Sequence, residues 1–259
     1  MNKGIIYIVV GKLRYLEECI FSASSLKKHC PDISVTLFTD KTDVKEKCFD
    51  EIKIIKNDIN PMKNKVKYMC DSPYEYTLFL DSDTEVKQPI DEMFEVLDKN
   101  DLAIAHSPQY DRSHFPAKLI SYADTHPDNA YNTGVILYKK SDAVEKFFTK
   151  WLEVVMLQDG NLMRAGYLCD QYYFNRLITN KYHLECGLKL GVLDNRVYNA
   201  RHPMIWHLQR IGEMGNIKII HCHDLHRSFL MRQYLRLSQR IDRDSFFKAI
   251  RQMSANSKE

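Results

Sequence analysis

Two aspartates that directly follow an apolar segment are the residues best placed to do chemistry. Residues 76–80, Tyr-Thr-Leu-Phe-Leu, are bounded by turn-forming residues, so we expect a buried strand there, followed by Asp81 and Asp83. In open α/β sheets ligands bind at the carboxyl ends of the strands. Two carboxylates at that edge are hard oxygen donors that suit Mg²⁺ or Mn²⁺. An isolated Asp-x-Asp is often a solvated turn, but the apolar run before this one favours a metal site.

Size and composition describe an ordinary globular protein. The 259 residues are enough for one large α/β domain, and a net charge of +3 is too small to predict nucleic acid as a partner. Seven cysteines without a C-x-x-C pair indicate reduced thiols in a cytosolic compartment. The apolar run 5–10 is too short for a signal peptide or a membrane span, and nothing later approaches about eighteen apolar residues. We therefore expect a cytoplasmic protein.

The order of the expected elements predicts an α/β fold with a mostly parallel central sheet flanked by helices. Apolar runs predict strands at 4–10, 34–39, 52–55, 76–80, 102–105 and 217–220, and another that follows a polar turn within the stretch 131–138. Helical periodicity predicts helices at 15–29, 63–70, 90–97, 141–157, from 170 onward, and at 228–253. Residues 107–129 are predicted to be irregular, and a loop of this length is more often functional than idle. It could face the acceptor of a reaction or act as a lid.

Other polar residues stand near the expected strand ends. Asn132 and Gly134 form a polar turn before a strand, where a glycine allows close approach of a backbone or ligand. His221 follows the strand 217–220, and a neutral imidazole is a good Mn²⁺ ligand beside carboxylates. His223 would project to the same side by alternation and remains an alternative ligand.

Two further features have both a structural and a functional interpretation. Asp170 and Gln171 begin a helix, where an aspartate is commonly a cap. Lys63, Lys65 and Lys67 form a cluster that is typical of a solvated helix face, or that supplies a cation for a diphosphate.

Taken in order, Asp81-Ser82-Asp83 in its apolar context, Asn132-x-Gly134 and Asp170-Gln171 resemble motifs of nucleotide-sugar-dependent glycosyltransferases with the GT-A fold, related to glycosyltransferase family eight. The resemblance covers residues 4–227. It implies a single GT-A (Rossmann-like) domain, residues 1–227, followed by a basic amphipathic C-terminal helical segment, residues 228–259.

The resemblance also implies roles for individual residues. Asp81, Asp83 and His221 would hold Mn²⁺ or Mg²⁺. Asn132, Asp170 and Gln171 would be catalytic residues that position the sugar and the acceptor. The donor, a nucleotide-diphosphate sugar that is expected to be UDP-linked, would contact Val9, Val10, Gly11, Tyr15, Lys65, Asp81, Ser82, Asp83 and Arg227. The acceptor would be a glycan, a lipid-linked molecule or another compound.

The chain departs from the family pattern at two places. The turn 11–15 keeps the family's tyrosine, Tyr15, but lacks the acidic residue that holds the uracil base. After the late histidine the family has a glycine and a lysine that touch the diphosphate. Here Leu225 or a neighbour stands for the glycine, and Arg227 could replace the lysine as a phosphate-binding cation.

Two other functions are compatible with this fold class. A sugar nucleotidyltransferase would usually carry a glycine-rich loop after the first strand, which residues 11–14 lack. A non-catalytic sugar- or nucleotide-binding protein would not need the intact carboxylate pair. The basic segment 228–253 either packs on the domain or lies on an anionic membrane surface, which here would be the inner membrane.

Overall fold

The computed structural model describes residues 2–57, 59–107, 109–111, 118–121, 131–158, 170–201 and 204–227. The chain divides into two compact units, 1–223 and 224–259. The first unit contains the central sheet and the residues around Asp81. Residues 228–259, and with them the predicted basic helix and its membrane contact, lie outside the described ranges. Within those ranges no helix is both long and apolar enough to cross a membrane.

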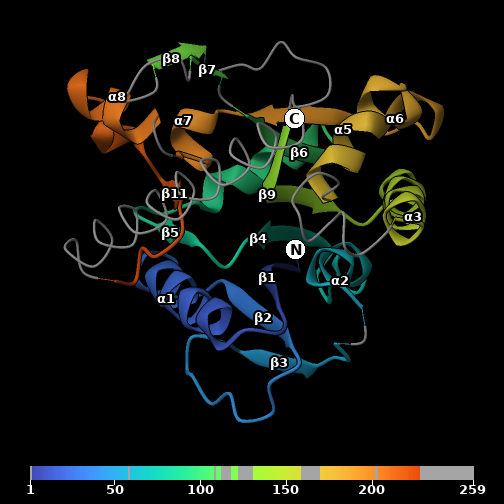
Figure 1. The fold of residues 1–259 in the computed structure, drawn as a ribbon, viewed down its shortest axis with the longest axis horizontal. Helices are drawn as coiled ribbons and strands as arrows, with labels where there is room; N and C mark the ends of the chain where they lie inside the picture. Colours follow the sequence, from blue (N-terminus) through green and yellow to red (C-terminus); the bar gives the residue numbers. More distant parts are fainter. Residues whose placement is uncertain are drawn as a thin grey trace, which may run out of the picture. The chain divides into compact units, whose positions relative to one another are not determined.

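The first unit is built on a seven-stranded sheet in the order β10-β6-β9-β4-β1-β2-β3 (Figure 1). In chain order the strands are β1 (Lys3–Val9), β2 (Ser34–Thr39), β3 (Glu51–Ile54), β4 (Tyr76–Leu80), β6 (Leu102–His106), β9 (Tyr131–Lys139) and β10 (Leu190–Leu193). The pairs β1–β2, β1–β4, β2–β3 and β6–β10 are parallel. Strand β9 runs antiparallel to both β4 and β6. The predicted mostly parallel sheet is confirmed.

Alternation along the strands sends buried side chains to both faces of the sheet, where helices cover them. On one face, side chains such as Ile5 and Tyr7 pack with α1 (Leu13–His29) and the 3₁₀ segment η1 (Asp91–Asp98). On the other face, Ile6 and its equivalents pack with α2 (Pro61–Met69), α3 (Asp142–Met156) and α5 (Asp170–Thr179). The result is a sheet between two helical layers.

A second, smaller sheet lies beyond the carboxyl end of β4. It consists of β5 (Thr84–Val86) and β11 (Ile219–His221), which pair antiparallel with Thr84 opposite His221. The backbone N–H of Cys222 donates to the carbonyl of Asp83 at 2.8 Å and continues this pairing. A segment late in the chain is thereby placed directly beside the Asp81–Asp83 turn.

The first unit also contains short helical elements: α6 (Tyr182–Glu185), α7 (Asn195–Tyr198), α8 (Met204–Arg210) and η2 (Met214–Asn216).

One prediction of secondary structure differs from what the structure shows, and another is made more specific. The segment 107–129 is not wholly irregular, because β7 (Gln109–Asp111) and β8 (Lys118–Ser121) pair antiparallel within it. The short helix predicted at 90–97 is the 3₁₀ segment η1, Asp91–Asp98.

Candidate metal and donor site

The turn after β4 presents two carboxylates at the edge of the central sheet. Leu80, the last residue of β4, is fully buried. The backbone N–H of Asp81 then donates to the carbonyl of Gly134 on β9 at 2.8 Å, and the Thr84 hydroxyl donates to the Asp81 carbonyl at 2.9 Å. These bonds fix the backbone of the turn, so Asp81 and Asp83 leave it from defined positions.

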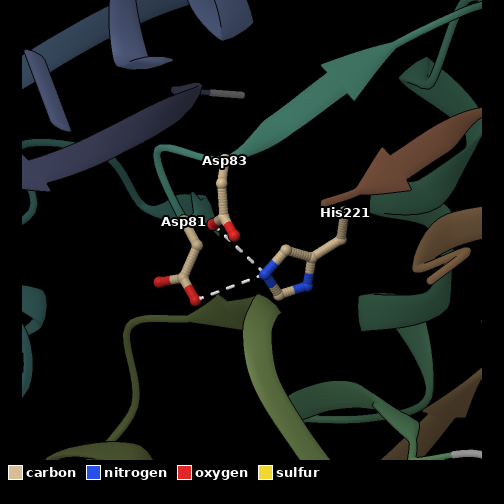
Figure 2. A group of neighbouring side chains, drawn as sticks. All are labelled: Asp81, Asp83 and His221. Atoms are coloured by element: carbon tan, nitrogen blue, oxygen red, sulfur yellow. Dashed lines mark ion pairs between the residues drawn. The ribbon is translucent and has the colours of Figure 1, made fainter. Parts of the chain in front are cut away.

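His221 completes a group with these two aspartates. Its Nε2 lies 3.3 Å from Oδ1 of Asp83 and 3.7 Å from Oδ2 of Asp81 (Figure 2). One ligand atom of each residue lies within 4.8 Å of the other two, a spacing that could hold a metal ion. Correcting the expectation, His221 is the last residue of β11 rather than the residue after a strand, and β11 belongs to the smaller sheet.

Gly134 makes room for this group. A Cβ atom built on Gly134 would lie 2.0 Å from Cε1 of His221 and 2.9 Å from Oδ2 of Asp81. Both distances are far below van der Waals contact, so any side chain here would displace the histidine or the carboxylate. The close neighbour of Gly134 is the His221 side chain rather than a backbone segment, and the approach of a ligand at this position stays a prediction.

Lys65 on α2 joins the carboxylates to a third acid. Its Nζ lies 3.0 Å from Oδ1 of Asp81 and 3.0 Å from Oδ2 of Asp170. The Thr133 hydroxyl donates to the same Asp170 oxygen at 2.8 Å, and the indole N–H of Trp151 donates to the Asp170 carbonyl at 2.9 Å. Asp170 is thus a buried ion-pair partner at the start of α5.

The charges of this group follow from their surroundings. Burial alone would raise the pKa of Asp83, but the neighbouring His221 and His223 outweigh it and hold the pKa well below its usual range. Burial alone would lower the pKa of Lys65, but Asp170 and Asp81 raise it above its usual range. Asp83 is therefore an ionised oxygen donor, and Lys65 remains a cation.

Buried amides line the other side of His221. Asn132 donates from Nδ2 to Oε1 of Gln171 at 2.7 Å, and its Oδ1 accepts from Nδ2 of Asn199 at 2.9 Å. Oδ1 of Asn199 lies 2.8 Å from Nδ1 of His221. Asn132 and Gln171 were predicted as site residues. Residues 197–199 carry little sequence signal for lining this cleft, yet Asn199, which directly follows α7, is buried and contacts the histidine.

His223 lies on the outer side of the same carboxylates. Its Nδ1 is 3.1 Å from Oδ2 of Asp83 and 3.5 Å from Oε1 of Glu18 on α1. The contact with Glu18 raises the pKa of His223, and Asp83 adds to the effect. His223 is 60% exposed whereas His221 is 4% exposed. His221, not His223, belongs to the group that could hold a metal.

The turn after β1 contains no acidic residue of its own, but an aspartate from the end of β2 lies against it. Gly11 adopts a positive φ of 87°, and its backbone N–H donates to Oδ2 of Asp40 at 3.1 Å. The side chain of Asn57 donates to the same oxygen at 2.9 Å. Asp40 follows β2 directly, so the rule that finds acids after apolar strands could have identified it.

The other residues predicted to contact the nucleotide-sugar donor lie at or after the end of β1, in α1, in the Asp81–Asp83 turn and in the second unit. Val9 ends β1 and Val10 is buried after it. Tyr15 lies in the first turn of α1 and packs partly against the core, while Ser82 lies between the two aspartates. Arg227 belongs to the second unit, 224–259, where its Nε donates to Oδ1 of Asp224 at 3.0 Å. Its predicted contact with phosphate stays a prediction.

Comparison with known proteins identifies the fold. No protein-family model matches the chain, and no curated protein matches it in sequence. Solved structures do match, among them the glycosyltransferase GlyE of Streptococcus pneumoniae TIGR4, with a TM-score of 0.55 at 17% identity over 85% of this chain and 54% of that one. The fold is that of GT-A glycosyltransferases.

Two further structures with this GT-A fold match over most of their length. Mouse xyloside xylosyltransferase 1 matches with a TM-score of 0.51 at 15% identity over 88% of this chain and 100% of that one. A glycosyltransferase involved in the glycosylation of the major capsid of PBCV-1 matches with a TM-score of 0.54 at 12% identity over 85% and 93%. The chain spans about half the length of the GlyE structure. At these identities the likeness establishes the fold alone.

The residues of the group fit a divalent metal ion. Two carboxylates and an imidazole nitrogen are a donor set that Mn²⁺ and Mg²⁺ accept. Nε2 of His221 faces the carboxylates while Nδ1 is engaged by Asn199. Because Gly134 has no side chain, the His221 ring and the Asp81 carboxylate can occupy the space beside its Cα. The three residues can therefore act as metal ligands without rearrangement of the backbone.

Proposed function

We propose that this protein is a metal-dependent glycosyltransferase that moves a sugar from a nucleotide-diphosphate sugar to a glycan, lipid-linked or other acceptor. One observation carries the proposal. Asp81, Asp83 and His221 converge at the edge of a GT-A sheet where ligands bind, although the histidine comes 138 positions after the second aspartate in the sequence. The GT-A fold of the neighbours supports it. Membership of family eight remains a prediction.

The three ligands define what the site does to a donor. Bound there, Mn²⁺ or Mg²⁺ would neutralise the negative charge that develops on the diphosphate leaving group. Asp83 is held ionised and suits this ligation. Because Gly134 has no side chain, the His221 ring can lie directly against its backbone.

In this proposal Lys65 acts on the diphosphate of the donor and Asp170 acts on its sugar. Lys65 is a permanent cation 3.0 Å from Asp81, so it contributes positive charge next to the diphosphate. Asp170 is held in place by Lys65, Thr133 and the Trp151 indole. Together with Asn132 and Gln171 it would orient the sugar and the acceptor, and orientation accounts for a large share of such rate accelerations.

Base recognition is assigned to the end of β2. A UDP-sugar requires an acceptor for the N3–H of uracil, and the turn 11–15 contains no acid. Asp40 lies against that turn through its bond to Gly11, and its side chain is 15% exposed. We propose that the Asp40 carboxylate accepts the hydrogen bond from the uracil N3–H, because the turn 11–15 has no acidic side chain to do so.

Thermal unfolding with a panel of nucleotides and nucleotide-sugars, each with and without Mn²⁺, tests the function. Ligand that binds only the folded state at a hundred times its Kd stabilises the protein by roughly 2.7 kcal/mol. We expect one diphosphate nucleotide and its sugar to stabilise the protein only with Mn²⁺, and Asp83→Asn to abolish the effect. Asp32→Asn, an exposed aspartate in a turn, is the control and should respond like wild type.

Product analysis separates the remaining functions. Release of a nucleoside diphosphate from a nucleotide-sugar, lost in Asp83→Asn, supports glycosyl transfer. Formation of pyrophosphate from a nucleoside triphosphate and a sugar phosphate would instead identify a sugar nucleotidyltransferase. Absence of any Mn²⁺-dependent stabilisation would favour a non-catalytic binding protein and would overturn the proposal.

A further inference from the structure

Four side chains, of which all but Gln171 are buried, and one backbone N–H form a continuous hydrogen-bonded chain that ends on His221. It runs from Gln171 through Asn132 and Asn199 to the imidazole, with distances of 2.7, 2.9 and 2.8 Å. Asn132, Asn199 and His221 are each at most 4% exposed. Water does not reach the polar atoms of these three side chains, so each of their N–H groups must face a hydrogen-bond acceptor within the protein.

The backbone of Gly134 determines the direction of every bond in this chain. Its N–H, which can only donate, lies 3.2 Å from Asn132 Oδ1, so that atom must be the amide oxygen. The Asn199 atom that faces the same oxygen must then be its NH₂ group. The oxygen of the Asn199 amide is therefore turned toward His221.

An acceptor at that position settles the state of the imidazole. Because Oδ1 of Asn199 can only accept, Nδ1 of His221 must carry a proton. In the neutral ring the lone pair is then on Nε2, the nitrogen that faces Asp81 and Asp83. A metal ion can be bound only through an unprotonated nitrogen.

We propose that Asn199 is a positioning residue that holds His221 in the tautomer with a bare Nε2, and that Asn132 acts through it. The inference rests on the proposed metal site. Without Asn199 the two carboxylates would attract the proton to Nε2, and the ring would donate to them instead of binding metal. Loss of such an orienting partner typically weakens metal binding by about 10- to 100-fold.

The series of hydrogen bonds also connects the metal ligand His221 to Gln171, a residue proposed to orient the sugar. Oε1 of Gln171 accepts from Asn132, so a ligand that rotates Gln171 would remove one hydrogen bond of Asn132, which in turn contacts Asn199.

Mn²⁺ titration of the full chain, followed by electron paramagnetic resonance of the free ion, tests the role of Asn199. Asn199→Leu, which has similar volume and no acceptor, should bind Mn²⁺ about 10- to 100-fold more weakly. Asn199→Asp retains an acceptor for Nδ1–H but loses the donor to Asn132, so it should bind Mn²⁺ more tightly than Asn199→Leu. Asn195→Ala removes another buried amide near α7, one that donates to the carbonyl of His106, and should leave Mn²⁺ affinity unchanged.

Nitrogen-15 NMR of wild-type His221, metal-free and at a pH where the ring is neutral, gives an independent readout that needs no variant to fold. We expect the proton on Nδ1. A proton on Nε2, or wild-type Mn²⁺ affinity in a folded Asn199→Leu protein, would overturn the role of Asn199 while leaving the metal site intact. A wild-type protein that binds no Mn²⁺ would overturn the proposed function and this inference with it.

Discussion

Gly134 and His221 are packed so closely that a Cβ atom on Gly134 would lie 2.0 Å from Cε1 of the histidine. The two residues come from different sheets, since Gly134 is on β9 and His221 ends β11. Their contact lies where the smaller sheet meets the edge of the central sheet. The Asp81 carboxylate is also too close to Gly134 to leave room for a side chain there. This contact makes the glycine a requirement of the metal group.

Replacing Gly134 by alanine should therefore disable the metal group. The methyl group must push His221 away from the carboxylates, and forcing extra volume into a packed site costs roughly 1–3 kcal/mol of folding free energy. We expect Mn²⁺-dependent thermal stabilisation to disappear while the protein still folds. Gly215→Ala, at a position with nothing within 4 Å of the added atom, is the matched control. Normal Mn²⁺ stabilisation of Gly134→Ala would contradict the geometry of the site.

Lys65→Met should destabilise the protein and weaken donor binding. The change leaves the buried Asp170 and the nearby Asp81 without their shared cation, and removing one partner of a buried pair typically costs about 3 kcal/mol or more. The unfolding free energy and the affinity for the diphosphate nucleotide measure the two effects. Lys67→Met is the comparison, because Lys67 is on the same helix with its ammonium over the Tyr68 ring, 5.0 Å from the ring centroid. Equal effects of the two substitutions would argue against a special role for Lys65.

Glu92 on η1 should make the stability depend on acid pH. Burial alone would raise its pKa, but hydrogen bonds from Lys218 and Tyr198 outweigh burial and lower the pKa from its usual value. The carboxylate therefore stabilises the fold above its unfolded pKa, and this contribution is lost as the pH falls through the folded pKa. Glu92→Gln should lower the melting temperature at neutral pH, and its difference from wild type should shrink under acid. A difference that grows in acid would show that the sign is wrong.

Asp40→Asn should weaken nucleotide binding more than it weakens the fold. Asparagine keeps an oxygen for the Gly11 N–H, but a neutral acceptor binds a base N–H less strongly than a carboxylate does. We expect affinity for the stabilising diphosphate nucleotide to fall roughly ten-fold, the size of one charge-assisted hydrogen bond. Calorimetric titration with the nucleotide in the presence of Mn²⁺ measures it. Unchanged affinity would remove Asp40 from the base site.

Most of the fold could be predicted from local patterns. The apolar runs gave the strands β1, β2, β4 and β6 within a few residues of their observed bounds, because a strand buried on both faces needs a continuous apolar segment. The hairpin β7–β8 was missed, since residues 107–129 are rich in polar and aromatic residues and show no apolar run. The predicted helix 90–97 became a 3₁₀ segment, whose hydrogen-bonding pattern the apolar spacing does not distinguish from that of an α-helix.

The sequence by itself determined which residues could do chemistry. An apolar strand followed by Asp81 and Asp83 places two carboxylates at a sheet edge, and the neighbouring residues alone are sufficient for that conclusion. The tertiary structure decided which partners meet them. His221 rather than His223 joins the group because β11 pairs antiparallel with β5 in one register. Lys65, Asp170 and Asn199 converge only because α2, α5 and the end of α7 pack around that edge. Side-chain periodicity repeats locally, so it carries no information on which distant segments pair or in which register.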